Sequence, residues 1–386
     1  GIDQQSWNEL NTSEDIPLLN RPLTGAYPPG STFKPFMALA ALELGKRTMT
    51  QAISDPGYFA FGNKIFRDDK PGGHGLVDMY RAVALSCDTY FYQLANEMGV
   101  DTMHDFMAQF GMGQITGIDL DNERKGLLPS TAWKRAAFKK PANQRWIPGD
   151  TISLGIGQGQ NTFTPLQMAH ATATLVNNGI VMKPHLVKQV EDPQSKQRSL
   201  TVPKESYRIP LKIENIEFIK NAMGGVVREG TGMRAFSGAA YTSGGKTGTA
   251  QVIAMKKTEK HGTKHAVERF RDHSWYIAFA PIDKPRIAVA IIVENGGYGS
   301  ESAAPIVRKA FDYYLPGKRP TEKAVPVQPA VGDEVEDLAH IHEEENAATV
   351  APTVAAPAPA IVKLPSVPAT TSVTSPVTSP ASPKLP

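Results

Sequence analysis

Residues 274–294 read SWYIAFAPIDKPRIAVAIIVE. Two apolar runs, 274–280 and 286–294, flank a short turn that contains two prolines, and the second run is rich in Ile and Val. Apolar, β-branched runs that are bounded by such turns are typical of strands. Because consecutive strands joined by a short turn pair antiparallel, this stretch predicts an antiparallel sheet late in the chain.

The segments on either side extend this pattern. Residues 244–252 predict a third, glycine-punctuated strand, and residues 303–315 predict a helix that covers one face of the sheet. Helical periodicity of apolar residues dominates earlier, at 31–44, 78–86, 88–98, 101–110, 164–177 and 214–228. Residues 1–27 are predicted to be irregular, and 54–76 and 113–163 to be loops. Helices early and strands late indicate an α+β fold.

The composition is that of a globular protein. Of 386 residues, 41% are hydrophobic and 20% are charged, and the net charge of +3 gives no reason to expect a nucleic-acid partner. The single cysteine, Cys87, excludes a disulfide within the chain. No run of about 18 apolar residues is present, so no membrane span is predicted. Because the sequence begins without methionine, we expect a fragment whose membrane anchor lies outside it.

The last part of the chain has a different composition. Nine of the 31 prolines lie in the last 36 residues, among Ala, Ser, Thr and Val. Such a segment cannot bury enough apolar surface to become ordered. We therefore predict one catalytic domain, residues 1–316, followed by a disordered tail, residues 317–386.

The helix predicted at 31–44 begins with a serine and a lysine that can react together. Ser31 and Lys34 are three residues apart, so their side chains share one face of a helix. A lysine that is partly removed from water can accept the hydroxyl proton of a serine nucleophile. Taken alone the pair carries little weight, because Ser-x-x-Lys arises about once or twice by chance in a chain of this length. An N-cap serine beside a surface lysine is the alternative.

Two further short motifs carry polar groups suited to the same chemistry. Lys246-Thr247-Gly248 lies on the predicted strand 244–252, where Gly248 allows a ligand to approach the backbone and the lysine can bind a carboxylate. Ser86-Cys87-Asp88 lies between two predicted helices, where Ser86 can relay a proton and Asp88 can hold Lys34. The alternatives are a basic strand residue beside a turn and ordinary helix caps.

The order and spacing of these three motifs resemble those of penicillin-binding proteins and serine β-lactamases. The resemblance covers about residues 10–315 and is closest to penicillin-binding protein 2, the class B transpeptidases of cell elongation in Gram-negative rods. Stretches around the motifs extend it: YPPGSTFKP (27–35), GIDL (117–120), GDTI (149–152), GIGQG (155–159) and KTGTAQ (246–251). One departure is Asp88, because the commoner middle motif ends in Asn, and an ionised Asp cannot donate a hydrogen bond.

The resemblance implies a penicillin-binding transpeptidase fold, in which an antiparallel sheet packs against helices beside an all-helical subdomain. It implies that Ser31, activated by Lys34, attacks the penultimate D-Ala carbonyl of a peptidoglycan stem peptide. Ser86, Asp88 and Lys246 would complete the catalytic set. Thr247, Gly248 and Thr249 would bind the substrate, with the backbone N–H of Thr249 in the oxyanion hole. β-Lactams would acylate Ser31.

The same resemblance implies a cellular setting. The protein would work at the periplasmic face of the inner membrane, with a RodA-type glycosyltransferase and a scaffold of the elongation machinery as partners. Three alternatives remain: a serine β-lactamase, a D,D-carboxypeptidase, and a sensor domain that only binds β-lactams or peptides. A β-lactamase needs a base that activates the deacylating water, and no Glu lies in a context that indicates one.

A metal site is a separate hypothesis, since the chemistry at Ser31 requires no cofactor. Cys87 lies within the middle motif, and Asp55, Asp68 and His74 precede it in a loop rich in Asp and Gly. One thiolate, one imidazole and two carboxylates form a plausible zinc set, which would fix this loop to the Ser86 segment as a structural site. The alternative is a buried thiol, an exposed histidine and two turn aspartates.

Overall fold

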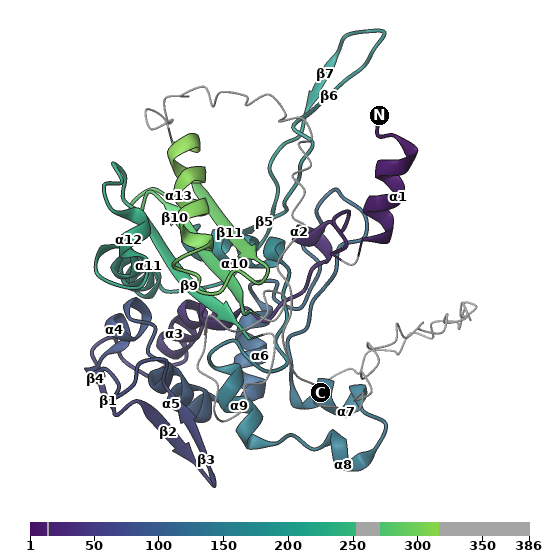
Figure 1. Cartoon of the computed structure of the whole chain (residues 1–386). Helices are drawn as coiled ribbons and strands as arrows, with labels where there is room; N and C mark the ends of the chain where they lie inside the picture. The colour runs from purple at the N-terminus through teal and green to yellow at the C-terminus, as the bar shows by residue number, and fades with distance from the viewer. Residues whose placement is uncertain (14, 252–270, 316–386) are drawn as a thin grey trace, which may run out of the picture. The chain divides into compact units, whose positions relative to one another are not determined.

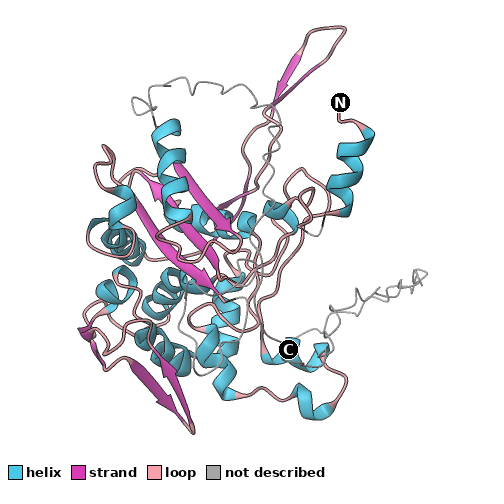
Figure 2. Cartoon of the chain, in the orientation of Figure 1, coloured by secondary structure: helices cyan, strands magenta, loops and turns pink. Residues whose placement is uncertain are grey.

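The late strands form the predicted sheet. The computed structural model describes residues 1–13, 15–251 and 271–315, in which β9 (Gly244–Ala250), β10 (His273–Ala280) and β11 (Ile287–Val293) pair antiparallel in the order β11-β10-β9 (Figures 1 and 2). Tyr276 of β10 lies opposite Thr247 of β9 and Ile291 of β11. In the described part of the chain, β9 and β11 are therefore the edges of the sheet.

Alternate residues of β10 belong to different cores. Tyr276, Ala278 and Ala280 pack in one apolar cluster with α13 (Ala303–Tyr314) and α12 (Met233–Phe236). Trp275, Ile277 and Phe279 join the larger cluster on the other face, where α10 (Pro165–Val176) and α11 (Ile213–Arg228) pack. Because strand side chains alternate between faces, a strand buried on both sides reads as one continuous apolar run, as β10 does.

The first long helix lies inside a helical subdomain. All residues from Lys34 to Leu42 are buried in α3 (Lys34–Glu43), whose sequence KPFMALAALE is apolar around almost its whole circumference. A helix that is hydrophobic on all sides is a buried helix. Around it lie α4 (Met79–Ala84), α5 (Asp88–Met98) and α6 (Val100–Ala108), while α9 (Pro148–Leu154) packs against α5.

The remaining elements are short. The helices are α1 (Gln4–Thr12), α2 (Arg21–Thr24), the 3-10 helix η1 (Gly30–Phe33), α7 (Thr131–Ala137) and α8 (Pro141–Gln144). The strands are β1 (Ile53–Asp55), β2 (Tyr58–Phe61), β3 (Lys64–Arg67), β4 (Gly75–Val77), β5 (Ile180–Met182), β6 (Gln189–Glu191), β7 (Arg198–Leu200) and β8 (Glu205–Arg208). They form four two-stranded pairs: β1 with β4, β2 with β3, β5 with β8, and β6 with β7.

Three local predictions were wrong or incomplete. The stretch 113–163 is not only loop, because it contains the helices α7, α8 and α9. Residues 1–27 are not wholly irregular, because Asp3 accepts a hydrogen bond from the Ser6 N–H at 2.8 Å and so caps α1. The stretch 54–76 is not a plain loop, because it contains two pairs of strands that are three or four residues long. The predicted tail, 317–386, lies outside the described residues, so the domain boundary remains a prediction. In the described residues, no helix combines the length and apolar character that crossing a membrane requires.

Candidate active site

Ser31 lies in η1, directly before the buried helix α3. Gly30 has a φ of +53°, a conformation that favours glycine, and the chain then turns into the helix. Ser31 is partly exposed, whereas Lys34 is fully buried. One helical turn thus places a serine hydroxyl at the surface of the site and an amine beneath it.

Lys34 is held by the middle motif. Its Nζ donates to Asp88 Oδ1 at 2.5 Å, to the Ser86 carbonyl at 2.7 Å and to Ser86 Oγ at 3.2 Å. The described residues contain no hydrogen bond between Lys34 Nζ and Ser31 Oγ, so the amine is directed toward Ser86 and Asp88 in this state. Ser86 has a φ of +63°, which is uncommon for a residue with a side chain and typical of functional turns.

Asp88 lies beside Lys34 in a poorly solvated position. Burial raises the pKa of its carboxyl, and the charge of Lys34 acts in the opposite direction. The carboxylate accepts the Lys34 hydrogen bond, as the sequence predicted. Asp88 therefore needs no proton to interact with Lys34, but an ionised Asp still cannot donate a hydrogen bond as an Asn can.

Lys246 is the second buried amine of the site. It is fully buried in β9, and its Nζ donates to the Thr247 carbonyl at 3.0 Å. Burial holds the pKa of Lys246 well below its usual value, and the charge of Lys34 lowers it further. A lysine with a lowered pKa gives up its proton more readily than an exposed lysine.

Strand β9 passes directly against the turn that carries Ser31. A Cβ added to Gly30 would lie 2.5 Å from the Thr249 carbonyl oxygen and 3.2 Å from the Thr249 nitrogen. A Cβ added to Gly248 would lie 2.8 Å from Cγ2 of Thr32. The two glycines allow this approach, which brings the Thr249 backbone beside Ser31. The first and third motifs therefore meet in one place, as predicted.

Three contributions to this site were not predicted. A Cβ added to Gly157, whose φ is +73°, would lie 2.1 Å from the Gly30 carbonyl oxygen. Gln158 Nε2 donates to the Thr249 carbonyl at 2.9 Å, and the hydroxyls of Thr231 and Thr247 are 2.6 Å apart. The glycine-rich stretch 155–159 was visible in the sequence, but nothing there indicated which residues it contacts.

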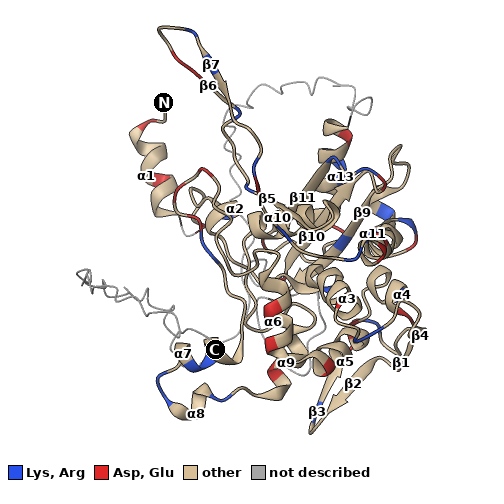
Figure 3. Cartoon of the chain, turned by 180° about the vertical axis from the view of Figure 1, so that it is seen from behind, with Lys and Arg blue, Asp and Glu red and all other residues tan. Residues whose placement is uncertain are grey.

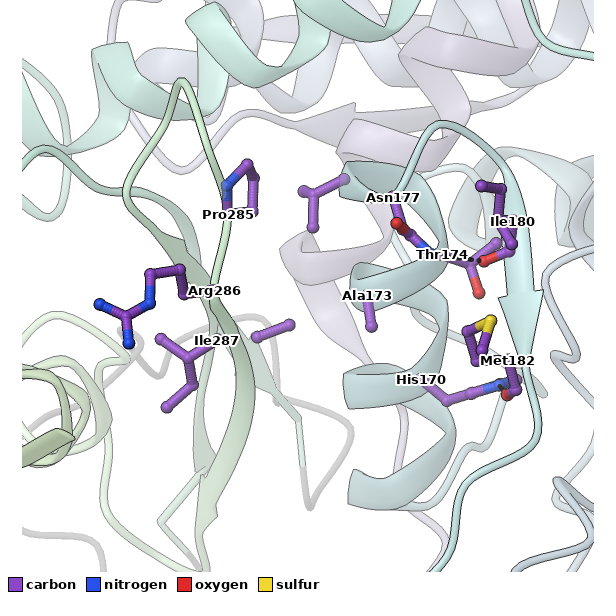
Figure 4. Close-up of a pocket in the computed structure, with 11 residues that line it drawn as sticks. His170, Ala173, Thr174, Asn177, Ile180, Met182, Pro285, Arg286 and Ile287 are labelled. Atoms are coloured by element: carbon purple, nitrogen blue, oxygen red, sulfur yellow. Dashed lines mark hydrogen bonds between the residues drawn. The ribbon is translucent and has the colours of Figure 1, made fainter. Parts of the chain in front are cut away.

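A cavity of about 190 Å³ lies elsewhere. It lies between α10 and β5 on one side and the start of β11 on the other. His170, Asn177 and Arg286 are among its lining residues (Figure 4). None of the residues predicted for catalysis lines it. The cavity therefore gives no support to a second location for the chemistry.

The four residues predicted to bind a metal come together. One ligand atom from each of Asp55, Asp68, His74 and Cys87 lies within 4.8 Å of the others. Asp55 Oδ2 is 2.8 Å from His74 Nδ1 and 3.3 Å from Cys87 Sγ, and His74 Nδ1 is 3.6 Å from Asp68 Oδ1. Both carboxylates and the thiol are buried. Of the alternative interpretation, only the exposed histidine is wrong, because the His74 side chain is 7% exposed. Asp55 and Asp68 do accept turn N–H groups, from Gly57 at 2.8 Å and from Lys70 at 3.0 Å.

This cluster fits a four-coordinate zinc ion. Zinc binds N, O and S ligands at about 2.0–2.3 Å with tetrahedral geometry, which sets neighbouring ligand atoms about 3.3–3.8 Å apart. The Asp55–Cys87 and Asp68–His74 distances lie in this range, whereas Asp55 Oδ2 and His74 Nδ1, at 2.8 Å, are at hydrogen-bonding distance. Two buried carboxylates also favour a cation nearby. The residues present thus fit a closed, structural site that joins the β1–β4 segment to the residue between Ser86 and Asp88.

Comparison with known proteins agrees with this geometry. Residues 3–312 match the model of the penicillin-binding protein transpeptidase domain. The chain belongs to this family. The predicted resemblance is confirmed as well, because the peptidoglycan D,D-transpeptidase MrdA of Haemophilus influenzae is 43% identical over 342 residues, which are 85% of this chain and 50% of that protein. The chain spans about half the length of the curated relatives it matches.

Solved penicillin-binding protein structures have the same fold. Penicillin-binding protein 2 of Pseudomonas aeruginosa, in complex with WCK 5153, has a TM-score of 0.71 and 40% identity, over 85% of this chain and 68% of that one. Penicillin-binding protein 2 of Helicobacter pylori, in complex with MreC, has a TM-score of 0.68 and 33% identity, over 82% and 55%. The predicted α+β transpeptidase fold is therefore confirmed.

Proposed function

We propose that this chain carries the transpeptidase activity of a peptidoglycan D,D-transpeptidase that cross-links stem peptides through an acyl-enzyme at Ser31. The observation that carries the proposal is the convergence of three motifs that are far apart in sequence. Lys34 is hydrogen-bonded to Ser86 and Asp88, and β9 packs against the turn that bears Ser31. Membership of the penicillin-binding transpeptidase family supports the same chemistry.

The first half-reaction is acylation. Ser31 Oγ attacks the carbonyl carbon of the penultimate D-Ala, and Lys34 in its neutral form accepts the hydroxyl proton. The backbone N–H groups of Ser31 and Thr249 stabilise the oxyanion. As the peptide bond breaks, Ser86 and Lys246 deliver a proton to the leaving amine, and the last D-Ala departs. The lowered pKa of Lys246 suits this transfer.

The substrate lies along β9. Among the described strands β9 pairs only with β10, so its other edge can bind an extended peptide by main-chain hydrogen bonds. Gly248 lets β9 lie against Thr32 and Pro29 beside the Ser31 turn, and the hydroxyls of Thr247 and Thr249 hold the substrate carboxylate. Thr231, 2.6 Å from the Thr247 hydroxyl, orients that hydroxyl.

The second half-reaction separates this function from its alternatives. In a transpeptidase an amine of a neighbouring stem peptide attacks the acyl-enzyme, Ser31 is released and the cross-link forms. A β-lactamase or a D,D-carboxypeptidase would use water instead. A β-lactam bound at Ser31 would remain attached in a transpeptidase, because its ester resists attack.

The test measures both half-reactions. Purified protein is given a donor peptide ending in D-Ala-D-Ala and an acceptor amine, and released D-Ala and cross-linked product are quantified. We expect cross-linked product together with D-Ala, and with nitrocefin at most one turnover. Continuous nitrocefin hydrolysis would favour the β-lactamase, and D-Ala release without cross-linking the carboxypeptidase. Absence of both acylation and D-Ala release would favour a sensor domain.

We further propose that Asp55, Asp68, His74 and Cys87 hold a structural zinc ion. When bound, zinc would supply the positive charge that balances the buried carboxylates and the thiolate. Cys87 stands between Ser86 and Asp88, so the cluster fixes the backbone that holds Lys34. Asp68 Oδ2 also accepts from the Thr89 N–H at 2.9 Å, which binds the same segment to the start of α5.

The cellular location and the partners of this protein are proposed from its similarity to known proteins. We propose that the protein works at the periplasmic face of the inner membrane, with a RodA-type glycosyltransferase and an elongation scaffold as partners. The similarity to a Helicobacter pylori protein solved in complex with MreC supports a scaffold of this kind. Co-purification of MreC and RodA with the tagged protein from its own cells tests these partners, and recovery of neither would contradict them.

A further inference from the structure

One segment of the protein is strongly cationic. Residues 131–147, here called the cationic arm, comprise α7, α8 and the loops after each of them. The arm contains five cations and no Asp or Glu: Lys134, Arg135, Lys139, Lys140 and Arg145. Figure 3 shows Lys and Arg in blue on α7 and on the loops next to α8. The whole chain has a net charge of only +3, so the charge of the arm is a local feature.

The base of the arm is fixed to the catalytic domain. Lys134 Nζ donates to Asp150 Oδ2 at 2.9 Å and lies 5.0 Å from the ring centroid of Trp146. Trp146 Nε1 in turn donates to Thr151 Oγ1 at 2.8 Å. Both partners belong to α9, so the arm is attached to the N-terminal turn of that helix.

Helix α9 joins the arm to the candidate active site. It packs against α5, and its C-terminus leads to Gly157, which contacts Gly30. The seven residues of α9 span about 10 Å. Each residue of an extended peptide spans about 3.3 Å, so the rest of a glycopeptide whose end lies at Ser31 can reach the arm.

The free cations point to an anionic ligand in water. Arg135, Lys139, Lys140 and Arg145 are exposed, and within the described ranges none of them is paired with a carboxylate. The aromatic side chains of the arm, Trp133, Phe138 and Trp146, are instead partly buried. The ring centroids of Trp133 and Phe138 are 6.1 Å apart, and the ring of Trp146 lies against the amine of Lys134.

We propose that the cationic arm binds the carboxylates of peptidoglycan stem peptides outside the catalytic cleft and so holds the polymer beside Ser31. This inference rests on the proposed function, which makes stem peptides the substrate. Each stem peptide that is not yet cross-linked ends in a carboxylate. A series of stems on one glycan strand is therefore a polyanion, which matches a group of exposed cations.

The chemistry of the arm favours this polymer over an anionic membrane. Segments that bind a membrane surface place Trp, Phe or Leu outward so that these side chains enter the lipid. In the arm, Ile147 is the one large apolar side chain that is mostly exposed, at 56%. Cations without an outward apolar face suit carboxylates in water.

The test compares two variants of equal charge. The arm variant is Arg135→Gln, Lys139→Gln, Lys140→Gln and Arg145→Gln. The control variant is Lys188→Gln, Lys196→Gln, Arg198→Gln and Lys204→Gln, which neutralises four exposed cations in and around the β6–β7 hairpin. Each protein is first acylated with benzylpenicillin, which blocks the cleft. Binding is then measured by sedimentation with purified sacculi, with sacculi whose carboxylates are amidated, and with phosphatidylglycerol vesicles.

We expect the arm variant to bind native sacculi about ten-fold more weakly, because several modest ionic contacts are lost. The control variant should bind within about two-fold of wild type. Wild type should bind amidated sacculi only weakly. Its affinity for them should equal the affinity of the arm variant for native sacculi. Equal binding of both variants to native sacculi would overturn the proposal, as would arm-dependent binding to vesicles alone. Benzylpenicillin acylation reports separately on the proposed function, since its absence in wild type would refute that function.

Discussion

Lys34 Nζ and Asp88 Oδ1 form an ion pair of 2.5 Å inside the catalytic domain. The lysine side chain is fully buried, and the aspartate side chain is 14% exposed. Removing one partner from such a pair leaves the other charge unbalanced in a poorly solvated place. The pair therefore positions the amine that is proposed to activate Ser31.

Substitutions at Asp88 should show whether the charge or the shape of its side chain holds Lys34. Asp88→Ala leaves Lys34 without a counter-ion and should cost about 3 kcal/mol or more of the free energy of unfolding. Asp88→Asn keeps an oxygen acceptor for Lys34 and should cost clearly less. Urea unfolding measures stability, and the rate of penicillin acylation measures function. Equal losses in the two variants would show that a neutral oxygen acceptor at this position does not hold Lys34.

The contact between Gly157 and Gly30 should matter for acylation. In Gly157→Ala the new methyl would collide with the Gly30 carbonyl and displace the turn before Ser31. We expect acylation by benzylpenicillin to slow more than ten-fold, since small displacements of reacting groups are costly.

Gly45→Ala is the matched control. Gly45 also has a positive φ, +62°, but a Cβ there would meet no atom within 4 Å. This variant should lose about 1 kcal/mol of stability to backbone strain and acylate like wild type. If the two variants acylate at the same rate, the contact at Gly30 has no role in positioning Ser31.

Much of this fold could be predicted because its signals are local. The sheet strands are continuous apolar runs, and α3, α4, α5, α10 and α11 show helical periodicity in the sequence. Helix α1 was missed because it has no buried residues and hence no apolar face to detect. The strands β1–β4 were missed because segments of three or four residues give too short a pattern.

The candidate site was only partly predictable for a different reason. Ser31, Lys34, Ser86 and Lys246 could be found because the order of their motifs resembles a known family. The contact between Gly30 and Gly157 joins backbone to backbone across a long stretch of chain, and neither glycine has a side chain that marks its partner. The link from Thr231 to Thr247 is likewise made by tertiary structure alone.

Removing metal should weaken the fold around the middle motif. We expect purified protein to contain about one zinc per chain, and a strong chelator to lower its melting temperature by several degrees. Cys87→Ser should bind less metal and respond less to chelator, because a thiolate ligand is lost. Metal analysis and thermal melting check this. Protein that contains no zinc and melts identically with chelator would remove the metal site.

The carboxylate of Glu294 should make stability depend on pH. It accepts from Tyr27 Oη at 2.6 Å and from Arg21 Nε at 2.7 Å, which fixes the segment just before the Ser31 turn. Burial acts to raise the pKa of Glu294, but these two donors outweigh it and lower the pKa below its ordinary value of 4.5. The stabilisation is therefore complete above pH 4.5 and is lost as the pH falls through the lowered value.

Glu294→Gln tests this dependence because it cannot ionise. At pH 7 wild type should be more stable than the variant by less than about 1 kcal/mol, since Glu294 is about one-third exposed. The difference should shrink as the pH falls below 4.5. Urea unfolding of both proteins across this range measures it. A difference that stays constant or grows with acidity would contradict the assignment.

The central claim is that Ser31 becomes acylated. Its most direct test is the intact mass of wild type and Ser31→Ala after incubation with benzylpenicillin. The account predicts that wild type gains the mass of one penicillin molecule and that Ser31→Ala, still folded by circular dichroism, gains none. No adduct on wild type, or an undiminished adduct on Ser31→Ala, would contradict it.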